Sequence, residues 1–185
     1  MRRGQLHDQA VEVRKSVINN IVTLPPRLRT EFETLLTDSS YDVVTAALTK
    51  LSEQFPDRLP QYLDNTKGVD GMDRKVKIRR FELIAATGNS AAVDSLVEYS
   101  GGSYEFRSRL NAFDALKRLN YLDERVIGSL FDAMTHWNNR LKNPATEVAQ
   151  YFYQQGAYKK LFRKYYRSHT WLPYQKSILE DFVGN

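Results

Sequence analysis

Apolar residues recur along this chain at the spacing of one helix face, and that pattern itself repeats. Four copies of one core position can be aligned: Val17-Ile18-x-x-Ile21, Ala47-Leu48-x-x-Leu51, Leu83-Ile84-x-x-Thr87 and Ala115-Leu116-x-x-Leu119. The offsets between successive copies are 30, 36 and 32 residues. Such a period is typical of arrays in which each helix pair buries its apolar face against the next pair. The pattern therefore predicts an architecture and, by itself, no chemistry.

The individual helices are predicted from apolar faces. One face is formed by Leu28, Phe32, Leu35 and Leu36, the next by Val43, Val44, Ala47, Leu48 and Leu51, and later ones by Phe106, Leu110, Phe113 and Leu116 and by Val126, Leu130 and Met134. No Asn-Gly or Asp-Gly turn joins two alternating strand patterns; Asp70-Gly71 lies in a polar linker. We therefore expect an all-α fold.

Prolines and short polar turns are expected to separate these helices. Pro26, Pro56 and Pro144 are predicted to open helices over residues 27–36, 57–64 and 145–155, because proline is tolerated in the first helical turn. The turns at 37–40, 88–90 and 101–103 are each expected to end one helix and to cap the next through a hydroxyl or Asn side chain.

We predict one domain over residues 1–185: an α-α superhelix, or solenoid, of about four helix pairs with a C-terminal helical cap. The predicted repeats cover residues 6–37, 38–72, 73–102 and 103–140, and the cap covers residues 141–185. With 42% hydrophobic residues, the chain can bury a substantial core.

Composition excludes several classes of function. The chain has no cysteine, so it has no disulfides, thiolate metal sites or cysteine nucleophiles. It has no run of 18 apolar residues, so no membrane helix or membrane partner is predicted, and its start lacks the apolar middle of a signal peptide. The compartment stays open between cytoplasm and periplasm.

The positive charge of the chain is concentrated near its C-terminal end. The net charge is +5, and Lys159, Lys160, Arg163, Lys164 and Arg167 fall where no acid lies between Glu147 and Glu180. On a helix these five residues share one face, opposite Tyr158, Leu161, Phe162 and Tyr165. The basic face is the candidate contact surface. It is compatible with a solvated end of the array, with an acidic neighbouring domain, or with nucleic acid.

Other residue types offer little chemistry. His7, His136 and His169 are far apart in sequence and predict no metal site. The acidic segment Asp64–Asp73 fails the calcium-loop template and reads as a solvated linker, and Gly101-Gly102-Ser103 reads as a helix stop with a Ser cap and not as a phosphate site. No nucleophile motif and no nucleotide-binding glycine motif occurs, so we predict no catalytic residue.

The run from Leu28 to Leu51 resembles a HEAT repeat, in which paired valines and an Ala-x-x-x-Leu core follow a helix that ends in Asp and a small residue. The resemblance extends over roughly residues 10–140. It implies a HEAT-like form of the predicted superhelix and implies no activity.

A narrower resemblance is carried by residues 104–119, followed by Asn138-Asn-Arg-Leu-Lys-Asn-Pro-Ala145 and Tyr165-Tyr-Arg-Ser-His-Thr-Trp171. These segments resemble the C-terminal HEAT-like region of bacterial zinc aminopeptidases of the aminopeptidase N family. That region is non-catalytic and packs against the zinc domain, where it restricts the substrate chamber. The family motifs His-Glu-x-x-His and Gly-x-Met-Glu-Asn are absent here, so no catalytic or zinc-binding residue is carried over.

The resemblance implies a non-catalytic domain that walls the substrate chamber and braces a catalytic domain on the N-terminal side of the same polypeptide. It places zinc in that catalytic domain and no cofactor in this chain, and we expect the chain to be part of a longer protein. The alternative is a free-standing HEAT-like module that binds protein or nucleic acid through the basic face. HEAT-like DNA-alkylation repair glycosylases keep the nucleic-acid alternative open.

Overall fold

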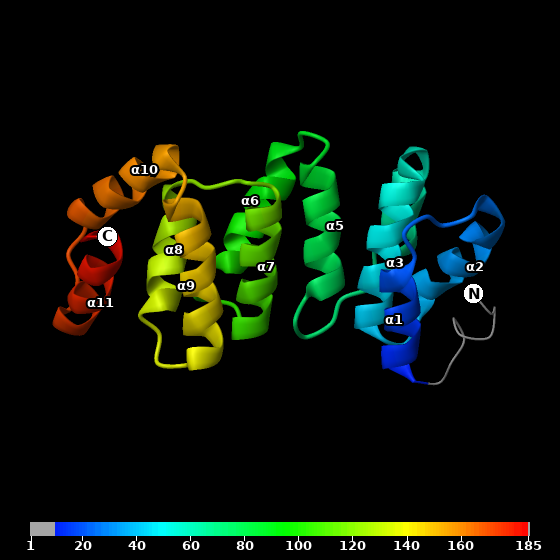
Figure 1. The fold of residues 1–185 in the computed structure, drawn as a ribbon, viewed down its shortest axis with the longest axis horizontal. Helices are drawn as coiled ribbons and strands as arrows, with labels where there is room; N and C mark the ends of the chain where they lie inside the picture. Colours follow the sequence, from blue (N-terminus) through cyan, green and yellow to red (C-terminus); the bar gives the residue numbers. More distant parts are fainter. Residues whose placement is uncertain (1–9, 185) are drawn as a thin grey trace. The chain divides into compact units, whose positions relative to one another are not determined.

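The computed structural model describes residues 10–184, and these residues contain eleven α-helices, three short 3₁₀ turns and no strand (Figure 1). The predicted all-α class is confirmed. Among residues 10–184, every helix is too short or too polar to cross a membrane. Contacts between Cα atoms divide the chain into an N-terminal unit that ends at Leu83 and a C-terminal unit that begins at Ile84. The HEAT-like superhelix and the repeat boundaries stay predictions.

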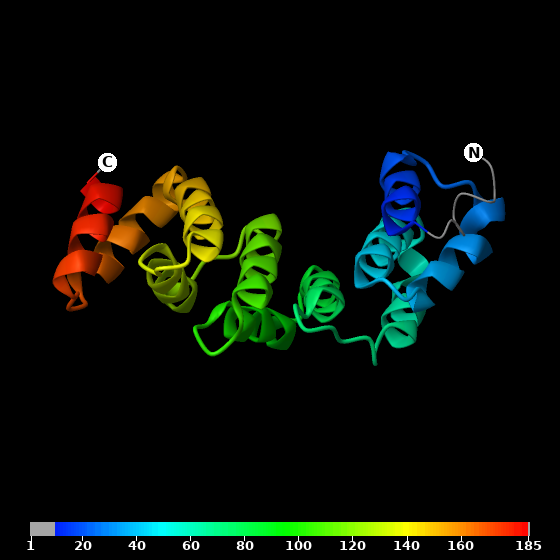
Figure 2. The ribbon, with the colours of Figure 1, turned by 90° about the horizontal axis from the view of Figure 1, so that it is seen from below.

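Helix α3, Tyr41–Gln54, is the centre of the N-terminal unit. It packs against α1 (Val11–Asn20), α2 (Arg29–Thr34) and α4 (Leu59–Asn65), as Figure 2 also shows for α1 and α3. The core of this unit contains Ile18, Leu24, Phe32, Leu35, Leu36, Val43, Ala47, Leu48, Leu51 and Tyr62. The two apolar faces predicted within residues 28–51 are therefore confirmed, with Leu28 at the edge of the core.

The recurring core position lies in α1, α3, α5 and α7, but its third copy is weak. Ile18, Leu48 and Leu116 are fully buried. In α5 (Lys75–Ala85), Leu83 and Ile84 are only half-buried, whereas Val76 and Ile78 of the same helix are buried. The division between the two units falls within α5, where the repeat pattern is poorest.

The helices of the C-terminal unit follow one another in chain order (Figure 1). They are α6 (Ser90–Ser100), α7 (Phe106–Arg118), α8 (Glu124–Met134), α9 (Asn139–Tyr153), α10 (Gly156–Arg167) and α11 (Pro173–Gly184). Helix α6 packs on α7, and α9 packs on both α7 and α8. Helix α10 is inclined to α8 and α9 and lies against both (Figure 1), and α11 lies against α10.

Side chains cap the starts of α6 and α7. One of these caps is the predicted residue, and the other is not. The Asn89 side chain accepts a hydrogen bond from the Ala92 N–H at 3.0 Å, so the predicted cap of the 88–90 turn is confirmed. In the 101–103 turn, Ser103 is not the cap. Helix α7 begins at Phe106, and the Glu105 carboxylate accepts hydrogen bonds from the N–H groups of Arg107 and Ser108. A carboxylate is favourable there because it also faces the positive end of the helix dipole.

Two of the predicted proline starts hold in a modified form. The segment predicted as a helix over 27–36 is a 3₁₀ turn (Pro26–Leu28), helix α2, and a second 3₁₀ turn (Leu35–Thr37). A 3₁₀ turn at Pro56–Arg58 likewise precedes α4. The tighter turn is a common form of a helix end.

The third proline start is wrong. Pro144 lies inside α9, which begins at Asn139 behind an Asn138 cap. Proline at this position removes the N–H that would bond the carbonyl of Arg140, and such a loss is tolerated here because that carbonyl lies in the first, exposed turn. The correction adds six residues at the N-terminal end of the predicted helix, including Lys142.

Candidate functional site

The basic face predicted from the sequence lies on α10, and its five cations fall in two rows. Lys159 and Arg163 are half-buried along the side that meets α9 and α11, whereas Lys160, Lys164 and Arg167 are exposed. The opposite side of α10 is apolar, as predicted, and Phe162 is fully buried. The predicted face therefore exists, but its members have different surroundings.

Arg163 is used inside the fold. Its Nε donates hydrogen bonds to the Tyr153 hydroxyl at 3.1 Å and to the Val183 carbonyl at 3.2 Å. The Tyr153 hydroxyl donates to the same carbonyl at 2.6 Å. Because Val183 lies in the last turn of α11, a guanidinium placed there satisfies a carbonyl that has no intrahelical partner and faces the negative end of the dipole. Arg163 thus joins three helices, and these contacts fix its position in the fold.

The other cations of the basic face have weaker attachments. The Lys164 ammonium lies 2.8 Å from a carboxylate oxygen of Glu124, with both side chains more than half exposed. The Lys159 ammonium lies 4.8 Å from the centre of the Tyr153 ring, in a cation–π arrangement. Lys160 and Arg167 are exposed to solvent. The positive potential of α10 is therefore partly cancelled by its own neighbours.

An aromatic cluster holds α10 and α11 on α8. Phe131 lies 5.6 to 6.2 Å from the ring centres of Phe162, Tyr165, Trp171 and Phe182. The close approach depends on a glycine, because a methyl group added at Gly128 would lie 2.5 Å from the Tyr165 hydroxyl. Burial, and secondarily the charge of Glu124, raises the pKa of Tyr165. This cluster fixes the C-terminal helices in position.

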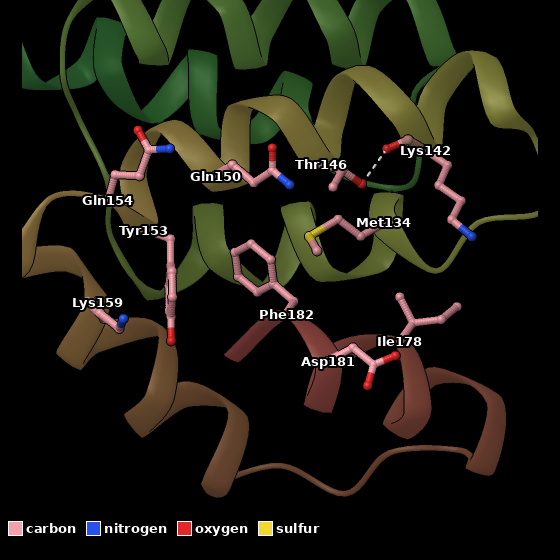
Figure 3. A pocket seen from close by; sticks show the side chains of 10 residues that line it. All are labelled: Met134, Lys142, Thr146, Gln150, Tyr153, Gln154, Lys159, Ile178, Asp181 and Phe182. Carbon is pink, nitrogen blue, oxygen red and sulfur yellow. Dashed lines mark hydrogen bonds between the residues drawn. The ribbon is translucent and has the colours of Figure 1, made fainter. Parts of the chain in front are cut away.

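A groove between α9 and α11 was not predicted from the sequence. It has a volume of about 680 Å³ and is shown in Figure 3. We call it the α9–α11 groove; its lining is Met134, Lys142, Thr146, Gln150, Tyr153, Gln154, Lys159, Ile178, Asp181 and Phe182. The signal that could have found it is a polar residue at every fourth position from Lys142 to Gln154. The incorrect helix start at Pro144 left Lys142 outside the predicted helix.

Large side chains are exposed in the loop between α8 and α9 and around the start of α11. Trp137 is 86% exposed, Leu172 57% and Tyr174 55%. Trp137 and Tyr174 line a second hollow of about 400 Å³ that shares Lys142 with the α9–α11 groove. The His136 ring stacks on Trp137 with 5.3 Å between centres, and its Nδ1 accepts a hydrogen bond from the Asn138 N–H. The loop between α8 and α9 therefore presents an indole supported from one side.

The residues considered for metal binding are separated. Within residues 10–184, no three His, Asp or Glu side chains lie close enough together to hold an ion. His136 belongs to the α8–α9 loop, the His169 ring stacks on Tyr165, and His7 lies outside the described residues. In the polar linker, Asp70 pairs with Arg74 and Lys77, and the Asp73 carboxylate accepts the Lys75 N–H. Cationic side chains and a helix start thus engage these carboxylates.

Comparison with known proteins adds no family to these observations. No protein-family model matches the chain, and no curated protein matches its sequence. The geometry of the C-terminal unit is therefore the basis for a functional proposal.

Proposed function

We propose that the chain is a non-catalytic helical-repeat domain that binds a protein partner through its C-terminal unit, and that this partner is the catalytic domain of a zinc aminopeptidase. The observation that carries the first part is the exposed Trp137, which lines a hollow together with the exposed Tyr174 next to the α9–α11 groove. Trp and Tyr are enriched in protein interfaces, and clustered exposure of large apolar side chains marks such surfaces.

The second part of the proposal rests on the sequence resemblance. The segments that carry it form α7, the start of α9 and the end of α10 with the following loop. In this role the helices would wall the substrate chamber and brace the catalytic domain, and zinc and the catalytic acid–base residue would belong to that domain. This chain would supply shape and a docking surface and no reacting group.

A free-standing binding module is the second candidate, supported by the exposed Lys160 and Arg167 on α10. Such side chains can contact phosphates. Nucleic acid is the less favoured partner because Arg163 and Lys164, of the same face, already contact groups of this chain.

Two experiments test the leading proposal. The first is to read the coding DNA in frame upstream of Met1, where the proposal expects a His-Glu-x-x-His motif. The second is to mix the separately produced catalytic domain with residues 1–185 and measure binding by calorimetry. Trp137→Ala should weaken that binding by about 30-fold or more, as expected for a buried interface tryptophan. Val22→Ala, at an apolar residue equally exposed in the N-terminal unit, is the control and should have no effect.

Three results would contradict the proposal. A stop codon directly upstream, without the zinc motif, would remove the aminopeptidase assignment. Zinc retained at one ion per chain after dialysis, or hydrolysis of an aminoacyl amide by residues 1–185 alone, would remove the non-catalytic assignment.

A further inference from the structure

One wall of the α9–α11 groove is a straight row of polar side chains. Lys142, Thr146 and Gln150 in α9 and Gln154, the residue directly after this helix, are spaced four residues apart, and Figure 3 shows them in line on one side of the groove. With a rise of 1.5 Å per residue, neighbours in this row are about 6 Å apart, and the whole row is about 18 Å long. We call it the polar row of α9.

This spacing is close to that of an extended peptide. In a strand, every second residue directs its N–H and C=O to the same edge, and these residues repeat at about 6.6 Å. Gln150 and Gln154 are exposed, and within residues 10–184 their side-chain amides make no hydrogen bond. Each amide offers both donors and an acceptor, the combination that a peptide edge requires. The Thr146 hydroxyl donates to the Lys142 carbonyl at 2.8 Å and can still accept a hydrogen bond.

The floor of the groove is apolar. Tyr153, Phe182 and Met134 lie between the polar row and α11, and Ile178 lines the α11 side (Figure 3). A peptide that used one edge for the polar row would direct alternate side chains onto this floor. The volume of about 680 Å³ accommodates a few large apolar side chains.

The charges around the groove favour an acidic occupant. Lys142 and Lys159 lie near opposite ends, with Asp181 on the α11 side between them (Figure 3). The lining of the groove therefore carries two positive charges and one negative charge. Within residues 10–184, the Lys142 ammonium makes no ion pair, so it can take a carboxylate without losing a partner.

We infer that the α9–α11 groove binds an extended, acidic segment of the protein partner, about five or six residues long, with large apolar side chains at alternate positions. The inference rests on the proposed function, because the occupant belongs to the same protein partner. Its hydrogen bonds run to Gln150 and Gln154, and a carboxylate pairs with Lys142.

The test uses the full chain of 185 residues and a fluorescein-labelled peptide, Asp-Leu-Ser-Phe-Ser-Leu-Asp, followed by fluorescence anisotropy at 0.15 M salt. We expect saturable binding, which Lys142→Glu weakens by at least about tenfold through loss of a charge-assisted hydrogen bond. Lys160→Glu is the matched control, since it makes the same change of charge on an exposed lysine outside the groove lining. It should change affinity by less than about twofold at this ionic strength.

Backbone methylation of the peptide tests the extended conformation. N-methyl groups on one set of alternate residues should abolish binding, and N-methyl groups on the other set should not. Gln150→Ala with Gln154→Ala should remove this difference and weaken the unmethylated peptide. Both glutamines are exposed, so these variants should keep the helical circular dichroism and melting temperature of the parent.

Three results would overturn the inference. They are no binding at peptide concentrations up to 1 mM, equal losses for Lys142→Glu and Lys160→Glu, and a dimer in sedimentation that Lys142→Glu dissociates. The last would show that a second copy covers the groove. Each is distinguishable from failure of the proposed function, because association with the catalytic domain and its sensitivity to Trp137→Ala are measured separately.

Discussion

The basic face of α10 and the polar row of α9 lie on neighbouring helices and differ in how much of their chemistry is available. The basic face holds five cations, yet Arg163 closes the end of α11 and Lys164 pairs with Glu124. The polar row holds one cation, and its two glutamine amides make no side-chain hydrogen bond within residues 10–184. A cluster of charged residues in a sequence therefore does not show how many of these charges a partner can contact.

We expect the largest loss of stability from a substitution on the apolar side of α10, opposite the basic face. Phe162→Ala should lower the free energy of unfolding by about 3–5 kcal/mol, because it leaves a cavity in the aromatic cluster around Phe131. Urea denaturation followed by circular dichroism measures it. Lys160→Ala, on the exposed side of the same helix, should change stability by less than about 0.5 kcal/mol. Similar effects of the two variants would mean that α10 does not pack as described.

The two arginines of the basic face should differ in their contribution to stability. Arg163→Ala should destabilise the fold by about 1–3 kcal/mol, because the Val183 carbonyl loses a charged donor and the buried Tyr153 hydroxyl loses a partner. Arg167→Ala removes the same charge from an exposed position and should stay within about 0.5 kcal/mol of the parent. Thermal unfolding of both variants provides the comparison, and equal losses would contradict a structural role for Arg163.

The sequence predicts the helices well because burial follows a period. The faces around Phe32, Leu48 and Leu116 are read from apolar spacing, and all three residues are fully buried. Proline was a less reliable indicator of where a helix begins, because it is tolerated at the first residue and also slightly later in the helix. Pro144 lies inside α9. The helix start at residue 139 was indicated by Asn138, whose side chain caps α9.

The candidate site was only partly predictable. The five cations of the basic face share a helix side, as expected, but the pairing of Lys164 with Glu124 joins residues 40 positions apart. The bond of Arg163 to Val183 likewise depends on how α11 folds back onto α10. The α9–α11 groove likewise forms because α11 folds back onto α10. Local spacing shows which residues share a helix face, and it does not show which distant helix covers that face.

The salt dependence of DNA binding measures how many cations of the basic face contact phosphates. For single-stranded DNA, the slope of log affinity against log salt is about −0.7 per contacted phosphate. If only Lys160 and Arg167 are available, the slope should be about −1.4, equivalent to a loss of about sevenfold between 50 and 200 mM salt. All five cations would give about −3.5. Anisotropy of labelled oligothymidine across a salt series distinguishes these values, and the steeper slope would favour the nucleic-acid alternative.

The smallest expected contribution to stability is the coupling free energy of the Lys164–Glu124 pair. Both side chains are mostly exposed, at 71% and 53%, so solvent screens the attraction and the coupling should be less than about 1 kcal/mol. A double-mutant cycle of Lys164→Ala and Glu124→Ala, measured by urea denaturation at low and at 0.5 M salt, gives the coupling directly. It should fall as salt rises. A coupling above about 2 kcal/mol that persists in 0.5 M salt would show that this pair is held as firmly as Arg163, and that the basic face is built into the fold along both of its rows.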